Sequence, residues 1–181
     1  MLRTGSLRTL LSFAVACAPG LAACSSPEGL HPGPDQVSTS DALLQGNATA
    51  AQLGIFRQRT ARDWAWAGGQ FDAPADDGAE LVAETPLTFA WHADPADFAQ
   101  GGAPGDSVMT HLLSFSTSGN ERLLEVFSTL PEYTPDAKGW QKLVDVAEPI
   151  TISLTTGTFV GGDLPEEGGP FIGQALTFTI E

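Results

Sequence analysis

Residues 150–156, ITISLTT, alternate strictly between apolar and hydroxyl side chains. Ile150, Ile152 and Leu154 fall on one face of an extended chain, and the hydroxyl residues between them fall on the other. β-Branched residues in this two-residue period are typical of a strand with one face in the core and one in solvent. The stretch therefore predicts a half-buried strand of antiparallel sheet.

Similar short runs flank this stretch, separated by Gly, Pro, Asp and Asn. The predicted strands cover residues 79–83, 86–91, 109–116, 122–128, 150–156 and 174–181. His111 shares the inward face of its strand with Leu113, whereas His92 follows an inward Trp91 and therefore faces outward. The strand number and spacing predict an all-β fold, an antiparallel sandwich of immunoglobulin-like size.

Two segments carry helical signals instead. Thr134 is placed to cap a short helix with Pro135 in its first position, and Trp140 and Leu143 lie three residues apart on one face. Earlier in the chain, Asn47 is placed to cap a helix through residues 48–64, although the glycine within it weakens the pattern.

The earlier segment also holds three of the few basic residues, Arg57, Arg59 and Arg62. One hypothesis makes them a contact patch for lipid phosphate or an acidic partner. In the other hypothesis, the arginines dock a basic helix on the acidic body of the same protein, and we favour this second hypothesis.

The sandwich pattern is accompanied by a family resemblance. Residues 73–91 (APADDGAELVAETPLTFAW) resemble the opening of fibronectin type III-like domains, with Trp91 on the second strand. Residues 124–143 and 150–181 are similar to the later strands, and their YTPD…W…L and GGPF…FTI phrases resemble a group of uncharacterised lipoproteins of myxobacteria. This resemblance implies an immunoglobulin/fibronectin type III-like fold over about residues 73–181 and brings no activity. The tyrosine corner and the cysteine pair of such domains are missing here.

The first 23 residues carry an export signal. Arg3 and Arg8 precede a short apolar run that is too short for a spanning helix and is interrupted by Pro19. The sequence Leu21-Ala22-Ala23-Cys24 then resembles the bacterial lipobox. That resemblance implies cleavage before Cys24 and acylation of Cys24. It gives a lipid-anchored protein of the bacterial cell envelope, and Ser25 and Ser26 favour the outer membrane.

Four regions follow from these observations. Residues 1–23 form the lipoprotein signal peptide and residues 24–40, rich in Pro, Gly and Ser, a flexible tether. Residues 41–71 form a helix or irregular segment, and residues 72–181 the β-sandwich domain. Both cysteines lie at or before position 24, so the domain must fold without a disulfide.

Charge and motifs exclude several function classes. The chain has a net charge of −14, and removing residues 1–23 takes away two arginines and no acid, which leaves −16. So acidic a surface repels nucleic acid. No GxSxG, HExxH or phosphate-binding glycine motif is present, and a metal site of His92, His111 and Met109 would need side chains of opposite faces. We therefore expect no enzyme, no catalytic residue and no resident cofactor.

The candidate binding site lies on two long loops, residues 92–108 and 161–173. In an immunoglobulin-like sandwich these loops would lie at the same end. Phe98 and Phe171 are the expected anchors for a partner. Asp106 and Asp163 are the acids by which the loops could hold Ca²⁺, the one ion to consider.

Together these features predict a membrane-anchored, non-enzymatic binding or adhesion module. Its membrane contact is the lipid on Cys24, and its further partner would be an envelope or extracellular protein or glycan. Two alternatives stay open: a structural or accessory envelope protein without a specific ligand, and a Ca²⁺-dependent domain that binds carbohydrate or protein.

Overall fold

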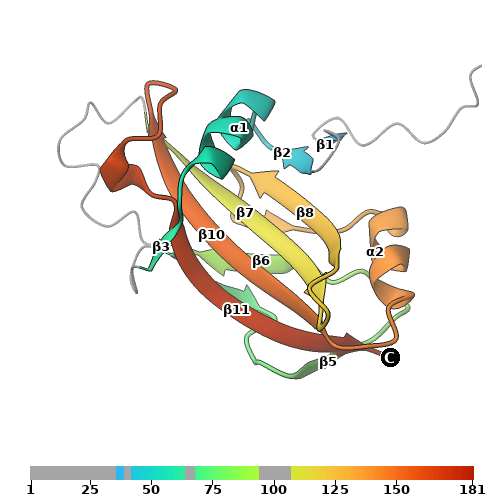
Figure 1. The fold of residues 1–181 in the computed structure, drawn as a ribbon. Helices are drawn as coiled ribbons and strands as arrows, with labels where there is room; N and C mark the ends of the chain where they lie inside the picture. The colour runs from blue at the N-terminus through green and yellow to red at the C-terminus, as the bar shows by residue number, and fades with distance from the viewer. Residues whose placement is uncertain (1–35, 39–41, 64–67, 94–106) are drawn as a thin grey trace, which may run out of the picture. The chain divides into compact units, whose positions relative to one another are not determined.

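The structure is a computed structural model that describes residues 36–38, 42–63, 68–93 and 107–181. All of these residues belong to the unit Pro32–Glu181. They form two β-sheets and two α-helices (Figure 1). The predicted mostly-β, sandwich-like architecture is thereby confirmed.

The larger sheet is built around four long antiparallel strands. Its order is β1–β2–β8–β7–β10–β11–β3, and β5 also pairs with β11. Its members are β1 (Gln36–Ser38), β2 (Leu43–Gln45), β3 (Arg62–Asp63), β5 (Ala79–Leu81), β7 (Ser107–Thr117), β8 (Arg122–Ser128), β10 (Ile150–Val160) and β11 (Phe171–Ile180). The short strands β2, β3 and β5 join the long ones in parallel. They cover parts of the outer edges of β8 and β11, which would otherwise be open to pairing with another chain.

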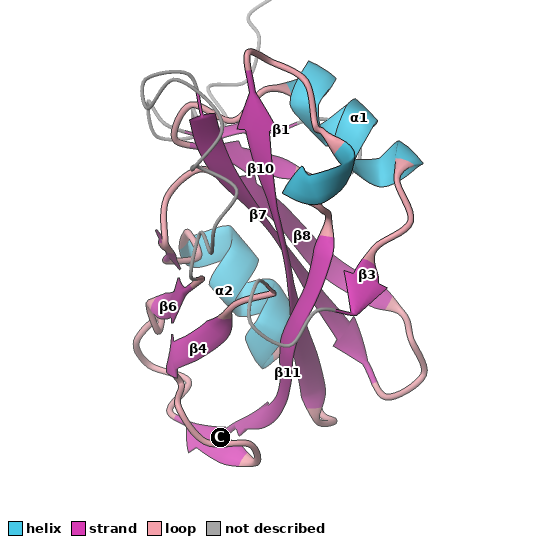
Figure 2. Ribbon diagram, turned by 90° about the vertical axis from the view of Figure 1, so that its left-hand side faces the viewer, coloured by secondary structure: helices cyan, strands magenta, loops and turns pink. Residues whose placement is uncertain are grey.

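The smaller sheet and the helices lie on the two faces of this larger sheet. The smaller sheet has the order β4 (Gln70–Ala73), β6 (Phe89–His92) and β9 (Glu132–Tyr133). Figure 2 shows β4, β6 and helix α2 (Ala137–Val144) on one side of the larger sheet and helix α1 (Ala50–Gln58) on the other. The larger sheet is therefore covered on both faces.

The two faces bury separate hydrophobic clusters. The main core lies between the sheets and is dominated by aromatic and aliphatic residues, with Phe89, Phe115 and Ile152 wholly buried. The second core lies under α1, where Leu53 and Phe56 of the helix meet Phe127 and Phe159 of the sheet. This second core explains why the folded body begins well before residue 72.

The apolar patterns of the sequence predicted the central strands well. The predicted strand 122–128 coincides with β8, and β10 begins at Ile150 but continues to Val160. Trp91 and Leu113 are buried, as expected. The predicted strand ended too early in β10. In the second half of β10, the face that would otherwise be open to solvent packs against α1, so the side chains no longer alternate between apolar and hydroxyl.

The predicted helices exist, but both begin later than expected. The N-cap of α1 is Thr49 rather than Asn47, in a capping box with Gln52, and the N-cap of α2 is Asp136 rather than Thr134. In each case the true cap oxygen accepts a hydrogen bond from the amide three residues on. The first helix ends at Gln58, whereas the predicted helix continued to residue 64.

The boundary expected at residue 72 does not separate the sheet from what precedes it. Strands β2 and β3 and helix α1, all within residues 41–71, contribute to the larger sheet or to its core. Of the expected tether, Gln36–Ser38 form β1, and residues 24–35 and 39–40 lie outside the described residues. Within the described ranges no helix is long and apolar enough to cross a membrane.

Candidate functional site

The second of the two predicted loops is largely ordered by its own backbone. Asp163 pairs with Val160 through two backbone hydrogen bonds, N–H to O at 2.8 and 3.1 Å. The turn between them is made by Gly161 and Gly162, whose φ angles of 59° and 93° suit glycine. The side chain of Asp163 is exposed.

The expectation for Phe171 was wrong. Phe171 is only 2 % exposed, and the guanidinium of Arg62 lies over its ring at 5.1 Å from the centroid. It is the first residue of β11, opposite Thr156 of β10. Phe171 is therefore part of the packed interior and not an anchor for a partner.

A register shift explains this error. Between Ser153 and Thr155 of β10 the pairing with β11 is irregular, so that β11 has one extra residue there. Such a bulge inverts the in–out alternation on either side of it. Leu176 and Phe178 point inward in one phase, Phe171 does so in the other, and Ile172 is left half exposed. The remaining two predicted site residues, Phe98 and Asp106, lie outside the described residues.

The three arginines of the helical segment all contact the protein's own body. Arg57 Nη2 donates to Glu125 Oε2, a carboxylate whose side chain is only 4 % exposed. Arg59 Nη2 donates to the carbonyl oxygen of Leu164 at 3.5 Å, and Arg62 donates to that of Glu166. The self-docking hypothesis is confirmed, with one carboxylate and two backbone carbonyls as acceptors.

Glu125 is the centre of this docking. Besides Arg57, Arg122 Nη1 lies 3.4 Å from its Oε2, and Ser114 Oγ donates to Oε1 at 3.3 Å. A buried carboxylate without such partners would be costly, because burial removes its hydration. The cluster therefore fixes α1 on the sheet by charge as well as by apolar packing.

A close approach of backbone and ring completes the placement of α1. A Cβ atom at Gly157 of β10 would lie 2.8 Å from Cε2 of Phe56. Only glycine leaves room for the ring at this point. The helix therefore packs near the β10–β11 connection, and its last turn faces that loop.

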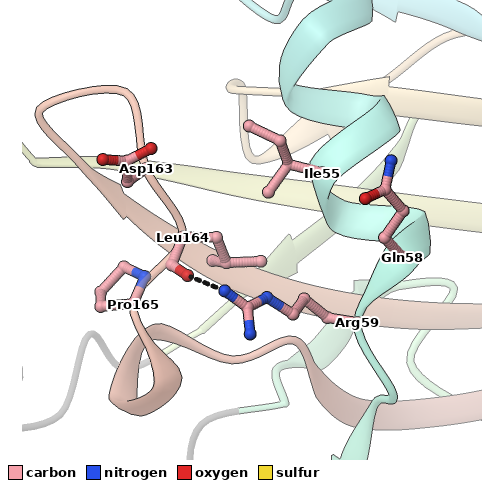
Figure 3. A pocket seen from close by; sticks show the side chains of 6 residues that line it. All are labelled: Ile55, Gln58, Arg59, Asp163, Leu164 and Pro165. Atoms are coloured by element: carbon pink, nitrogen blue, oxygen red, sulfur yellow. Dashed lines mark hydrogen bonds between the residues drawn. The ribbon is translucent and has the colours of Figure 1, made fainter.

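An open pocket results between the last turns of α1 and this loop. Its volume is about 640 Å³, and it is lined by Ile55, Gln58, Arg59, Asp163, Leu164 and Pro165. Figure 3 shows Ile55 of α1 and Arg59, the residue that follows α1, extending towards the loop that carries Asp163, Leu164 and Pro165, whereas Gln58 lies at the other side of the helix end. Its polar lining groups are a guanidinium, an amide and a carboxylate.

The polar groups of this pocket retain hydrogen-bonding capacity. Among the described residues, the side chains of Gln58 and Asp163 make no hydrogen bond or ion pair, and Arg59 makes only its long one to Leu164. A guanidinium has five N–H donors, and a carboxylate accepts at two oxygens. The pocket therefore offers donors and acceptors to a ligand.

The two histidines of the body lie in different environments. His92 is exposed and its Nδ1 lies 2.8 Å from Asp72 Oδ1. His111 is buried edge-on against Trp91, at 5.5 Å between ring centroids, and burial lowers the pKa of its imidazole to about 4. The predicted opposite orientation is confirmed. Within the described ranges, no group of three or more His, Cys, Asp or Glu is arranged to hold a metal ion.

Two of the six pocket residues had been singled out from the sequence, Asp163 as a loop acid and Arg59 as one of the three arginines. Ile55 and Gln58 gave no signal beyond their places in the predicted helix, where residues three and four apart lie together. Their meeting with the loop depends on the long-range contact of α1 with β10. Comparisons with known protein families, with curated proteins and with solved structures find no match to this chain.

Proposed function

We propose that this protein is a lipid-anchored protein of the bacterial cell envelope whose folded body is a non-enzymatic binding module. The observation that carries the proposal is the sequence Leu21-Ala22-Ala23-Cys24, directly after a basic start and a short apolar run. In this proposal residues 1–23 are removed and Cys24 becomes the acylated first residue.

The energetics of lipid anchoring support a stable attachment. Each buried methylene group contributes about 0.8 kcal/mol, and one chain of myristoyl length gives only reversible binding. Two or three acyl chains on one cysteine would hold the protein on the membrane without a spanning segment. We place it at the outer membrane on the strength of Ser25 and Ser26.

Binding is favoured over catalysis by the chemistry of the described residues. The open pocket presents a cation, an anion and an amide without a nucleophile beside them. His111, the inward histidine, is buried against an indole and its Nδ1 has no partner within the described ranges. A nucleophile–base–acid arrangement needs a histidine that is held by a carboxylate and is open to substrate.

The proposed partner is a protein or glycan of the envelope or the surroundings of the cell, and not a nucleic acid. The net charge of −16 that remains without residues 1–23 repels polyanions over the distance of a Debye length. Binding of this kind requires no cofactor.

An immunoglobulin/fibronectin type III-like relationship is part of the proposal. It is supported by two facing sheets that enclose Trp91 and by the resemblance of residues 73–181. The parallel pairing of β2 with β8 and of β3 and β5 with β11 departs from the antiparallel sandwiches of that class. We regard these short strands as additions at the sheet edges.

Substitution of Cys24 tests the anchor, and Cys17 provides the matched control. Cys24→Ala is expected to abolish incorporation of labelled palmitate and to leave the precursor uncleaved at this position, because the thiol is the acceptor of the lipid. Cys17→Ala removes the other cysteine from within the apolar run and should be labelled and cleaved as the wild type. Palmitate label on the Cys24→Ala protein would refute the anchor.

A further inference from the structure

We infer that the pocket between α1 and the β10–β11 loop is a binding site for a neutral polyhydroxylated ligand, a sugar unit of a glycan. This inference rests on the proposed binding function and names its ligand class. It starts from the six residues that line the pocket, and from what their side chains leave unpaired.

The size of the pocket suits a small polar ligand. Its volume of about 640 Å³ lies within the range of about 300–1,000 Å³ that is usual for sites of small molecules. It is open to one side, as a site must be if it takes one unit of a longer chain. Because it is open, a single sugar unit would be bound weakly, and affinity would grow with the number of units.

The charge of the pocket favours a neutral ligand. Arg59 and Asp163 both line it, so their formal charges cancel, and they form no ion pair with each other among the described residues. An anion would be repelled by Asp163 and by the exposed Glu166 and Glu167 that follow it in the loop. For a cation, repulsion by Arg59 is offset by attraction to Asp163, so the charged lining residues favour neither sign of charge. A ligand without charge also avoids the cost of removing a charge from water.

The hydrogen-bonding groups suit hydroxyl groups in type. A sugar hydroxyl both donates and accepts, so it needs donors and acceptors side by side. Arg59 supplies donors, Asp163 supplies acceptors, and the amide of Gln58 supplies both. All three end in planar groups that present two atoms together, which is the geometry that pairs with two neighbouring hydroxyls.

The remaining lining residues suit the apolar side of a sugar ring. Ile55 on the helix and Pro165 on the loop present aliphatic surface to the pocket. The C–H groups of a pyranose ring would pack against this surface while the hydroxyls face the polar groups. No lining residue is aromatic, so the site lacks the flat platform that a nucleobase would need for stacking.

Saturation-transfer NMR on the purified full chain tests this inference. Glucose, galactose and N-acetylglucosamine, each as the monomer and as a β-linked oligomer, are the sugar probes. Dialanine and inorganic phosphate are the zwitterionic and anionic probes. We expect saturation transfer to the ring protons of at least one sugar, stronger for its oligomer, and none to dialanine.

Three exposed residues provide the variants and the control. Asp163→Ala and Gln58→Ala remove hydrogen-bonding partners without touching the core, and each should weaken sugar binding, by about tenfold for the charged partner. Asp76→Ala removes an exposed acid that is outside the pocket and has no partner among the described residues, and should change nothing.

Two kinds of result would overturn the inference. The first is no saturation transfer to any of the sugars, or transfer to dialanine or a shift with phosphate instead. The second is sugar binding that Asp163→Ala and Gln58→Ala leave unchanged, since the site would then lie elsewhere. Palmitate labelling of Cys24 is measured in a separate experiment, so a failure to bind sugars would not refute the lipid anchor.

Discussion

Replacement of Trp91 by alanine is expected to lower the free energy of unfolding by about 3–5 kcal/mol. Trp91 is 2 % exposed and lies in β6 between the two sheets, opposite Phe71 of β4 and against the ring of His111. The substitution leaves a cavity that the surrounding strands fill only in part. Urea unfolding followed by circular dichroism measures the loss as a lower midpoint with an unchanged slope.

Trp91→Phe is the matched control for this effect. The indole Nε1 of Trp91 is buried without a hydrogen-bond partner among the described residues. Phenylalanine at this position loses some packing volume, which destabilises, but it also removes the unpaired buried donor, which stabilises. We expect this variant to lose less than half of what the alanine variant loses. A loss below about 1 kcal/mol for Trp91→Ala would show that this residue is not part of the core.

The stability of the protein should fall steeply between pH 6.5 and pH 4 because of His111. Burial lowers the pKa of His111 from 6.5 to about 4, so the unfolded chain takes up a proton that the folded chain refuses. The stabilisation is present in full above pH 6.5 and is lost as the pH falls towards 4. The whole effect corresponds to about 3 kcal/mol.

A comparison of two histidine variants isolates this effect from the carboxylates. The difference in unfolding free energy between wild type and His111→Gln should shrink by about 3 kcal/mol from pH 7 to pH 4, measured by urea unfolding at several pH values. His92→Gln, at an exposed histidine in contact with Asp72, is measured alongside it as the second variant. A pH-independent difference for His111→Gln would contradict the assignment.

The central strands could be predicted from the sequence because their environment is simple. In the first half of β10, one face packs on the main core, and the alternation of side chains reports this directly. In β8 the apolar run is continuous because Val126 packs in the main core and Phe127 in the second core. The short strands β2, β3 and β5 carry no such pattern. They are defined by their pairing with distant parts of the chain, which local periodicity does not encode.

The site was harder to predict than the fold, for two physical reasons. A bulge in the pairing of β10 with β11 reversed the orientation expected for Phe171, and a bulge leaves little trace in the sequence. The pocket itself depends on the docking of α1, for which Gly157 and Glu125 are the decisive residues. The arginines of the helical segment did indicate this docking, since they stand out in so acidic a chain.

The central claim, a protein anchored by lipid on Cys24, is tested most directly by the intact mass of the wild-type chain extracted from the cell envelope. Mass spectrometry of the protein and of its N-terminal peptide would locate both the cleavage and the lipid. We predict a chain that begins at Cys24 and carries a diacylglyceryl thioether on its sulfur, with an acyl group on the freed amine. A mass that corresponds to unmodified residues 1–181, or to a chain with a free Cys24 thiol, would contradict the claim.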